Sequence, residues 1–327
     1  MKTKFNIKKF WRFWDTWGVF VIFVVVAAIF GLMDPKVLQP AQLLSVVNRS
    51  SWIAIMAAGM AFAICTGGFD LAAGSMFSLC GALMAGFIMK SGMTPVVAIL
   101  ATFGVALVLS LINGLLISKL KIVPFVTTLG TQLIFDSIAQ VYTNNIGINI
   151  ATEKYEGFLQ TIGNGNLFGF IPYKLVIVAI VYVIAILGYR STKLGTKIRA
   201  VGSNEAAART CGINADNILI ITYMITSFAA ALGAVIYTAT MRSASPNSGV
   251  GKECEAITAV VIGGTSLKGG RANLIGALIG AVLVEFVKMC LNIMSAPEAI
   301  RVIVTGAVLL LALTIDGIKL MTQKEAK

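Results

Sequence analysis

Four polar side chains recur at every fourth position of a mostly apolar stretch, FVTTLGTQLIFDSIAQ (125–140). They are Thr128, Gln132, Asp136 and Gln140. In a helix each step of four residues turns about 40° past a full turn, so the four form one slowly winding stripe. Hydroxyl, amide and carboxylate groups in such a stripe can offer a polar solute weak, exchangeable hydrogen bonds. The stripe predicts one wall of a translocation path, and the structural alternative is a hydrogen-bonded seam between packed helices.

Charged residues inside apolar stretches are a second candidate for chemistry: Asp136, Glu285 and Lys288. A bare carboxylate at the bilayer centre costs about 2.5–3.5 kcal/mol on insertion scales, so each charge should face water or a partner. Glu285 and Lys288 are three residues apart and can neutralise each other on one helix face. Such charges could also couple ion movement to transport, which keeps an ion-coupled secondary transporter open as an alternative.

The residue sets of common enzyme and metal sites are absent from the sequence. There is no histidine, and no two of the five cysteines form a C-x-x-C pair. No G-x-x-x-x-G-K-[ST] phosphate loop occurs either. We therefore predict that the chain is not an enzyme, with no catalytic residue, no metal site and no bound cofactor of its own.

Membrane helices must position these residues. Hydrophobic residues make up 57% of the 327 residues and charged residues 12%, and the mean hydropathy is +0.89, whereas soluble domains carry about 25% charged residues. A helix of about 20 apolar residues spans the hydrocarbon core. The sequence thus predicts an all-α polytopic membrane protein with about ten spans; because the eighth is short, nine spans plus a re-entrant segment stay open. The predicted spans are 16–33, 51–66, 74–89, 95–118, 123–142, 173–189, 217–240, 255–267, 274–292 and 299–315.

Lysine and arginine set the orientation, because cytoplasmic loops carry an excess of them. With the N-terminus inside and alternating spans, 17 of the 26 Lys and Arg residues fall inside, 8 outside and 1 within a span. This predicts two cytoplasmic termini: a segment 1–15, a transmembrane domain 16–317 and a tail 318–327. The net charge of +12 is then explained by basic residues that lie against anionic lipid headgroups, and it does not indicate nucleic-acid binding. No loop is long enough for a folded domain, so any ATP-driven work needs partner subunits.

Two glycine-rich elements lie between predicted spans, TGGFDLAAGS (66–75) and IGGTSLKGGR (262–271). At an offset of 196 residues they pair Gly67 with Gly263 and Gly68 with Gly264, a weak indication of an internal repeat. Glycine can end one helix, and Asp70 can cap the next by accepting amide hydrogen bonds. A role for Asp70 in contacting solute or a docked partner is the alternative. The motif residues are Gly67, Gly68, Asp70, Gly74, Gly263, Gly264, Gly269, Gly270 and Arg271.

A charged segment, 190–215, is predicted to be cytoplasmic and includes RAVGSNEAAARTCGIN (199–214). Ser203 or Asn204 can cap a short helix there, and Gly212 suits its C-terminal stop. The small residues of EAAA would let another protein approach the backbone closely, so a soluble partner could push this helix. The alternative is an ordinary solvated loop. The candidate contact residues are Arg199, Gly202, Asn204, Glu205, Ala206, Ala207, Arg209 and Gly212.

Both glycine elements, the charged segment and VPFVTTLGT (123–131) resemble, in this order and spacing, the ribose/arabinose/galactose-type permease subunits of ABC importers. The resemblance covers about residues 40–317. It implies about ten helices per subunit, an architecture similar to that of vitamin B12-type importers, and a bacterial cell membrane. It also implies three partners: a second permease subunit, identical or paralogous, a cytoplasmic ATP-binding subunit, and an external solute-binding protein. Segment 199–214 would then be the coupling element that contacts the ATPase. One departure is Ala72-Ala73, where the family usually has Ser-Val.

The residues and the resemblance together predict the membrane-spanning permease subunit of an importer for a pentose or hexose, with ATP bound only by its partner. Three alternatives stay open at this point. One is a related permease for nucleosides or another small polar solute. The others are the ion-coupled secondary transporter and a pore-forming channel without energy input.

Overall fold

Helices make up most of the computed structural model, which describes residues 7–297, 299–308, 310–311 and 314, with side chains from residue 18 onward. The long helices are α1 (Ile7–Met33), α2 (Pro40–Cys65), α3 (Ala72–Met89), α4 (Pro95–Ser118), α5 (Pro124–Thr143), α8 (Tyr173–Ser191), α11 (Ala215–Met241) and α13 (Leu274–Ile293). The short ones are η1 (Pro35–Leu38), α6 (Thr152–Tyr155), α7 (Phe158–Asn164), α9 (Lys193–Ser203), α10 (Glu205–Thr210) and α12 (Lys252–Ile262). A further helical stretch covers 299–308.

Within the described residues, six helices are long and apolar enough to cross a membrane: α2, α3, α4, α8, α11 and α13. This confirms a mostly helical, polytopic membrane protein. Helix α5 is 20 residues long but is not among the six, since its threonines, glutamines and aspartate lower its hydropathy. The apolar part of α1, Gly18–Met33, and the stretch Ala299–Val308 are shorter than the six.

Three predicted spans differ from the observed helices, and the first of them, 16–33, lies in a helix α1 that begins at Ile7. Helix α2 begins at Pro40 and not at residue 51, because proline at the first helical position pre-sets the backbone and Arg49 is carried inside the helix. Helix α12 covers Lys252–Ile262 instead of 255–267. Its 11 residues rise about 16 Å, half the hydrocarbon core. The chain then turns at Gly263, and the 263–271 turn, which contacts the end of α2 and α9, leads to α13. Helix α12 is therefore a half-length segment.

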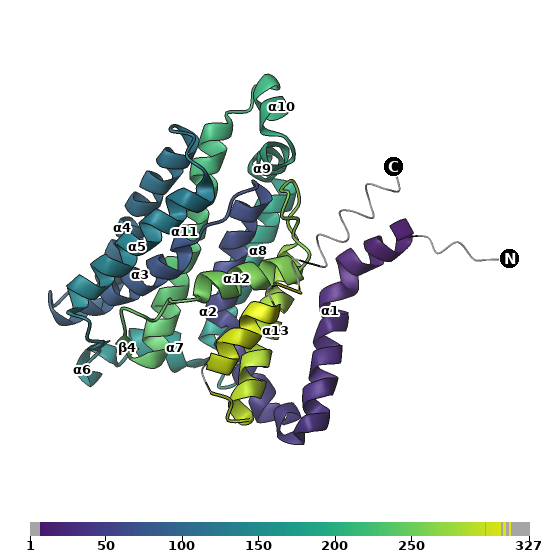
Figure 1. Cartoon of the computed structure of the whole chain (residues 1–327). Coiled ribbons are helices and arrows are strands. Elements are labelled where there is room, and N and C mark those ends of the chain that lie inside the picture. The colour runs from purple at the N-terminus through teal and green to yellow at the C-terminus, as the bar shows by residue number, and fades with distance from the viewer. Residues whose placement is uncertain (1–6, 298, 309, 312–313, 315–327) are drawn as a thin grey trace.

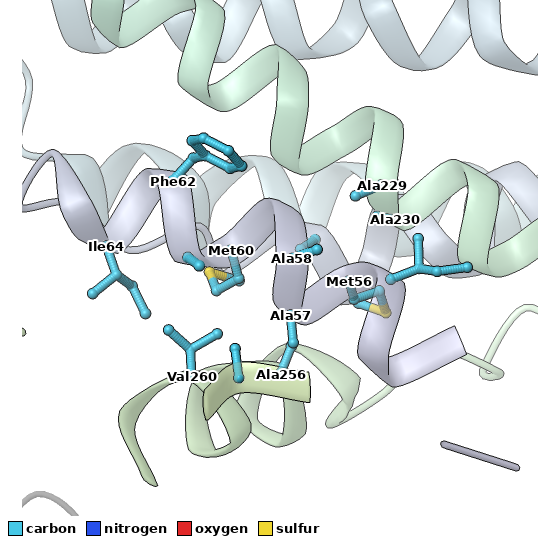
Figure 2. Close-up of a cluster of buried hydrophobic side chains, with 14 of the residues drawn as sticks. Met56, Ala57, Ala58, Met60, Phe62, Ile64, Ala229, Ala230, Ala256 and Val260 are labelled. Carbon is cyan, nitrogen blue, oxygen red and sulfur yellow. The ribbon is translucent and has the colours of Figure 1, made fainter. Parts of the chain in front are cut away.

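Helix α2 occupies the centre of the bundle. It packs against α8, α11, α12 and α13, and every residue from Ser50 to Cys65 is buried. Figure 2 shows α2 between α11 and α12, with Ala57 pointing toward Ala256 of α12 and Ala58 on the side of Ala229 of α11. A helix with small and apolar side chains on all faces can be enclosed in this way, whereas an amphipathic helix cannot.

The remaining long helices lie on two sides of this centre (Figure 1). On one side α3 contacts α4 and α5, and α4 also packs against α11. On the other side α1 packs against α13, with the rings of Phe23 and Phe286 5.3 Å apart. One face of α5 stays open and apolar; Leu133 on that face is 65% exposed.

The two ends of the bundle carry different connections. Helices α9 and α10 lie at one end, whereas α6 and α7 lie at the other (Figure 1). The segment that the sequence leaves as a loop, 143–172, therefore has structure of its own. It includes β1 (Ile148–Asn149), which pairs with β4 (Ser243–Ala244), and the hairpin of β2 (Asn166–Leu167) with β3 (Ile171–Pro172).

Candidate coupling and translocation sites

The short helix α10 forms as its sequence predicts. Asn204, and not Ser203, is the N-cap: its side-chain oxygen accepts a hydrogen bond from the Ala207 amide at 3.0 Å. The helix stops at Gly212, whose φ of +79° places it in the left-handed region that glycine favours. Ala206 and Ala207 are exposed, while Ala208 is buried against the bundle. The outer face of α10 thus presents small side chains and backbone.

Ion pairs tie α10 to two neighbouring elements. Glu205 contacts Arg209 at 2.8 Å on the same helix, and Arg209 also contacts Asp216 in the first turn of α11. Lys119 and Lys121, from the turn between α4 and α5, each contact Asp216 at 3.0 Å. A movement of α10 would therefore act on the turn that leads into α5.

The same contacts shift the acid groups of this network. Hydrogen bonds from Arg209, Lys121 and Lys119 hold the pKa of Asp216 well below its usual range. The hydrogen bond from Arg209 also lowers the pKa of Glu205. Both carboxylates stay charged at neutral pH. Because the network is largely exposed, each pair contributes little to folding and its strength depends on salt.

A glycine junction joins α9, the end of α2 and the turn between α12 and α13. We use this name for Cys65, Gly202, Gly269 and Gly270. The Gly270 amide donates to the Cys65 carbonyl at 2.8 Å. A Cβ atom on Gly202 would overlap that same carbonyl oxygen, and one on Gly270 would overlap the Ser203 hydroxyl. The backbones therefore touch directly, with no side chain between them.

Arg199 strengthens the junction from α9. Its guanidinium donates to the Tyr189 carbonyl at 2.7 Å and stacks on the Tyr189 ring with 5.0 Å between the guanidinium carbon and the ring centroid. The Tyr189 hydroxyl in turn accepts from the Ala272 amide at 2.7 Å. Arg271, beside it, is exposed, and its carbonyl accepts from the Ser266 amide at 3.0 Å.

The two glycine motifs end their helices in the same way. Gly67 after α2 and Gly264 after α12 both have a φ of +85°. The Gly67 and Gly264 amides donate to the carbonyls three residues earlier, both at 2.9 Å. Gly68 and Thr265, next along the chain, donate to carbonyls five residues earlier at 3.1 and 3.2 Å. The two helix ends therefore superimpose in backbone conformation at an offset of 197 residues. This is one residue more than the offset of 196 at which the glycines of the two motifs match in sequence.

The second motif is closed by Asn273. Its side chain accepts from the Gly276 amide at 3.0 Å, capping α13, and donates to the Gly263 carbonyl at 2.8 Å, capping the end of α12. A Cβ atom at Gly263 would overlap the Gly276 backbone. Small residues on α13 therefore pack within the bundle.

The first motif is packed differently. A Cβ atom on Gly74 would overlap the carboxylate of Glu253, at the start of α12. Gly68 lies against the Tyr223 hydroxyl. Asp70 is fully buried, and neither carboxylate oxygen has a hydrogen-bond partner among the described residues. Helix α3 has Leu71 at its N-cap position with no side-chain cap, so Asp70 does not cap it.

The polar stripe of α5 is buried at one end and only partly covered along the rest of its length. Thr128 is fully buried and donates to the Pro124 carbonyl at 2.9 Å. The Gln132 amide donates to Glu253 at 3.5 Å, and Asp136 is close enough to Glu253 for their charges to interact. Gln132, Asp136 and Gln140 are half-buried. The stripe thus runs along the boundary between the packed side of α5 and its open face, where it meets the start of α12.

A cavity of about 620 Å³ lies on the other side of α12. It is bounded by α2, α11, α12, α13 and residues 301–306, near the end of the bundle opposite α10. Four cations and two carboxylates line it, together with two aromatic rings and several smaller side chains. Its lining includes Arg49, Trp52, Tyr237, Lys252, Cys254, Glu255, Thr258, Glu285, Lys288, Asn292, Arg301 and Thr305.

Comparison with known proteins identifies the family to which the chain belongs. The family model described as branched-chain amino acid transport system / permease component matches residues 42–313. The chain belongs to this permease family. It is 36% identical to the ribose import permease protein of Bacillus subtilis (strain 168) over 88% of each chain. It is 33% identical to the galactofuranose transporter permease protein of Escherichia coli (strain K12) over 86% of this chain and 82% of that one. No solved structure matches it.

Sequence reasoning missed several groups that the permease brings together. One missed group is the ion network of Lys119, Lys121 and Asp216. These residues lie at the ends of predicted spans on the same side of the membrane, and their opposite charges could have predicted the network. Glu253 and Glu255 come two residues apart at the start of α12, so they point to different sides: Glu253 toward α5 and Glu255 toward Lys288. The Glu285–Lys288 pair is observed at 3.7 Å, but the shorter contact of Lys288 is to Glu255 at 2.9 Å.

Proposed function

We propose that the chain is the membrane-spanning permease subunit of an ATP-binding-cassette importer that moves a pentose or hexose across a bacterial cell membrane. The observation that carries this is the match, over nearly the whole chain, to proteins named as ribose and galactofuranose permeases. A run of membrane helices with a capped cytoplasmic helix at one end supports it. ATP would be bound and hydrolysed only by the partner subunit.

The topology proposed here has ten membrane segments with α12 as a half-length one, and both termini cytoplasmic. The excess of Lys and Arg at the α10 end of the bundle supports that orientation. Residues 1–6 and 315–327, which hold the two ends, lie outside the described residues. A membrane-impermeant thiol reagent should modify a cysteine at Asn164 from outside and one at Ser203 only from inside. Reversed labelling at both positions would invert this topology.

Three partners follow from this function. The cytoplasmic ATP-binding subunit would seat on α10, whose exposed alanines let its backbone be approached. The external solute-binding protein would dock at the opposite end, where α6 and α7 lie. A second permease subunit, identical or paralogous, would cover the open apolar face of α5, so that the boundary stripe of Gln132 and Asp136 faces the path between the subunits.

Two routes would carry the movement of the ATPase into the membrane. The ion network joins α10 to the α4–α5 turn and so to the stripe. The glycine junction joins α9 to the end of α2 and to the α12–α13 turn. Because the junction is backbone against backbone, a displacement of α9 cannot be absorbed by side-chain rotation and must move its neighbours.

The deciding experiment is uptake by proteoliposomes that contain the permease, its cognate ATPase and its cognate binding protein. We expect uptake of the sugar that the binding protein selects, dependent on both ATP and the binding protein. A ligand screen of the binding protein with pentoses, hexoses and nucleosides would identify the solute. Uptake that follows an ion gradient in the absence of the ATPase would replace this function with the secondary transporter.

A further inference from the structure

The cavity between α2 and α13 is lined by ionisable groups that belong neither to the α5 stripe nor to the coupling segment. Arg49 is the tenth residue of α2, and Glu285 and Lys288 lie in the second half of α13. Charges on membrane helices are expensive unless they face water, a partner or a polar ligand. The cavity is also of the size that small-molecule sites have, about 300–1,000 Å³.

The walls offer donors and acceptors side by side. Lys288 bridges Glu255 at 2.9 Å and Glu285 at 3.7 Å. Arg49 lies within electrostatic reach of Glu285. Asn292 and Thr305 add an amide and a hydroxyl to the lining. A polyhydroxylated ring needs such a mixture, because every hydroxyl group both donates and accepts a hydrogen bond.

Aromatic rings complete the lining. Trp52 and Tyr237 meet edge to face with 5.2 Å between their centroids. The Lys252 ammonium lies 5.2 Å from the centroid of Tyr237 and 5.3 Å from that of Phe77, an arrangement that helps to stabilise a buried cation. Apolar ring faces beside a few convergent polar groups are typical of sites for small organic ligands.

The lining leaves two ligand classes to compare. Its four cations against two carboxylates favour an anion such as phosphate, whereas the hydroxyl, amide and aromatic groups beside them favour a neutral polyol. The proposed function selects the polyol, and the test below includes phosphate as the competing outcome.

Helix α12 connects this cavity to the coupling apparatus. Its first residues, Lys252, Cys254 and Glu255, line the cavity. Its last turn leads into the 263–271 turn, whose Gly270 is bonded to Cys65 in the glycine junction. A displacement of α9 would reach the cavity wall through this 11-residue helix.

We propose that the cavity bounded by α2, α11, α12, α13 and residues 301–306 is a binding site for the transported monosaccharide within the membrane domain, opened and closed by α12. This rests on the proposed function and adds a site to it, on the opposite side of α12 from the α5 stripe. The binding protein would deliver the sugar to this end of the bundle.

Cys254 supplies the probe, because it lines the cavity and is partly exposed while Cys65, Cys80 and Cys290 are buried. The experiment uses the whole importer in proteoliposomes, with no ATP present during labelling. A small hydrophilic methanethiosulfonate is added, and modification of Cys254 is followed by peptide mass spectrometry. The same measurement is repeated with ribose, galactose, leucine or inorganic phosphate. A Lys36→Cys variant, exposed on η1, is the matched control outside the cavity and away from α6 and α7.

We expect Cys254 to react and the transported sugar to protect it. At a sugar concentration about ten times the dissociation constant, the rate of modification should fall about tenfold by mass action. The introduced cysteine of the Lys36→Cys control should react without protection. The change Arg49→Gln should raise the sugar concentration needed for half protection, whereas Arg190→Gln, at the cytoplasmic end of α8, should not.

Three outcomes would overturn the site. They are an unreactive Cys254, no protection by a sugar that the same preparation transports, and protection by leucine or phosphate in place of the sugar. In each of these cases sugar uptake by the preparation leaves the proposed function standing. If instead the wild-type importer moves no sugar, the proposed function itself fails.

Discussion

The two ends of α12 differ in how they contact the rest of the bundle. At its C-terminal end the glycine junction brings three backbones into contact and leaves no room for a side chain. At its N-terminal end long charged side chains surround an open volume of about 620 Å³. A displacement at a backbone contact cannot be absorbed by side-chain rotation and moves the neighbouring helix. Flexible charged side chains, in contrast, can rearrange around a solute. In the proposed function, movement of the ATPase would enter the membrane domain at the C-terminal end of α12 and act on the cavity at its N-terminal end.

The largest expected effect comes from filling the glycine junction. Gly202→Val places side-chain atoms against the Cys65 carbonyl, and overpacking of this kind typically costs about 1–3 kcal/mol or more. We expect a lower thermal midpoint in detergent and loss of ATP-dependent uptake. Gly104→Val is the matched control, because nothing lies within 4 Å of a Cβ at that position. Equal midpoints for the two variants would mean that the junction is looser than described.

A charge reversal on α10 should separate coupling from folding. Glu205→Lys puts a third cation beside Lys121 and Arg209. Docking of the ATPase should weaken, and so should the ionic contact between α10 and the α4–α5 turn. We expect uptake to fall at least about tenfold, equal to 1.4 kcal/mol, while insertion of the permease is unchanged. The control is Ser91→Lys in the exposed turn between α3 and α4, away from α10 and not part of α6 or α7. Normal uptake together with normal stimulated ATPase activity would remove α10 from the coupling route.

The stripe on α5 tests whether the path also uses the other side of α12. Gln132→Leu combined with Asp136→Leu removes the polar groups that face Glu253 while keeping the helix apolar. We expect uptake to drop several-fold. In single-cysteine scans of 125–140, positions 132 and 136 should react with a small hydrophilic thiol reagent in the assembled importer, and Leu129 and Leu133 should react more slowly. Unchanged uptake by the double variant would assign Thr128, Gln132 and Asp136 to a hydrogen-bonded seam.

The smallest expected effect concerns the cap of α10. Asn204→Ala removes the hydrogen bond to the Ala207 amide, a loss that typically costs about 1 kcal/mol of helix stability. We expect α10 to exchange its amide hydrogens faster while the rest of the bundle is unaffected, with a modest decrease in coupled uptake. Asn217→Ala, exposed in the first turn of α11, provides the comparison. Unchanged exchange at Ala207 would show that the ion pairs alone maintain α10.

Local features were predictable from the sequence, and long-range ones were not. The Asn204 cap and the Gly212 stop are decided within a few residues, and both are observed where the sequence predicts a short helix. The long apolar runs likewise predict the six spanning helices.

Features decided by distant partners could not be read in this way. Arg49 is tolerated within α2 because it lies near Glu285, more than 200 residues away. Helix α12 stops early because its end is held by Asn273 and its turn is bonded to Cys65. The sequence match between the two glycine motifs has an offset of 196 residues. The equivalent backbone hydrogen bonds at the two helix ends have an offset of 197 residues.

The burial of α2 has a consequence for how the protein is made. Every helix that encloses it lies at least a hundred residues further along the chain, from α8 to α13. At about 5–20 residues per second, the ribosome needs on the order of 10 s or more between finishing α2 and finishing α11. During that interval a helix with Arg49 and two buried serines must stay in the bilayer without its final neighbours. Nascent chains that end before α11 should therefore be targets of membrane quality-control proteases, and a stop codon before position 215 should leave almost no fragment behind.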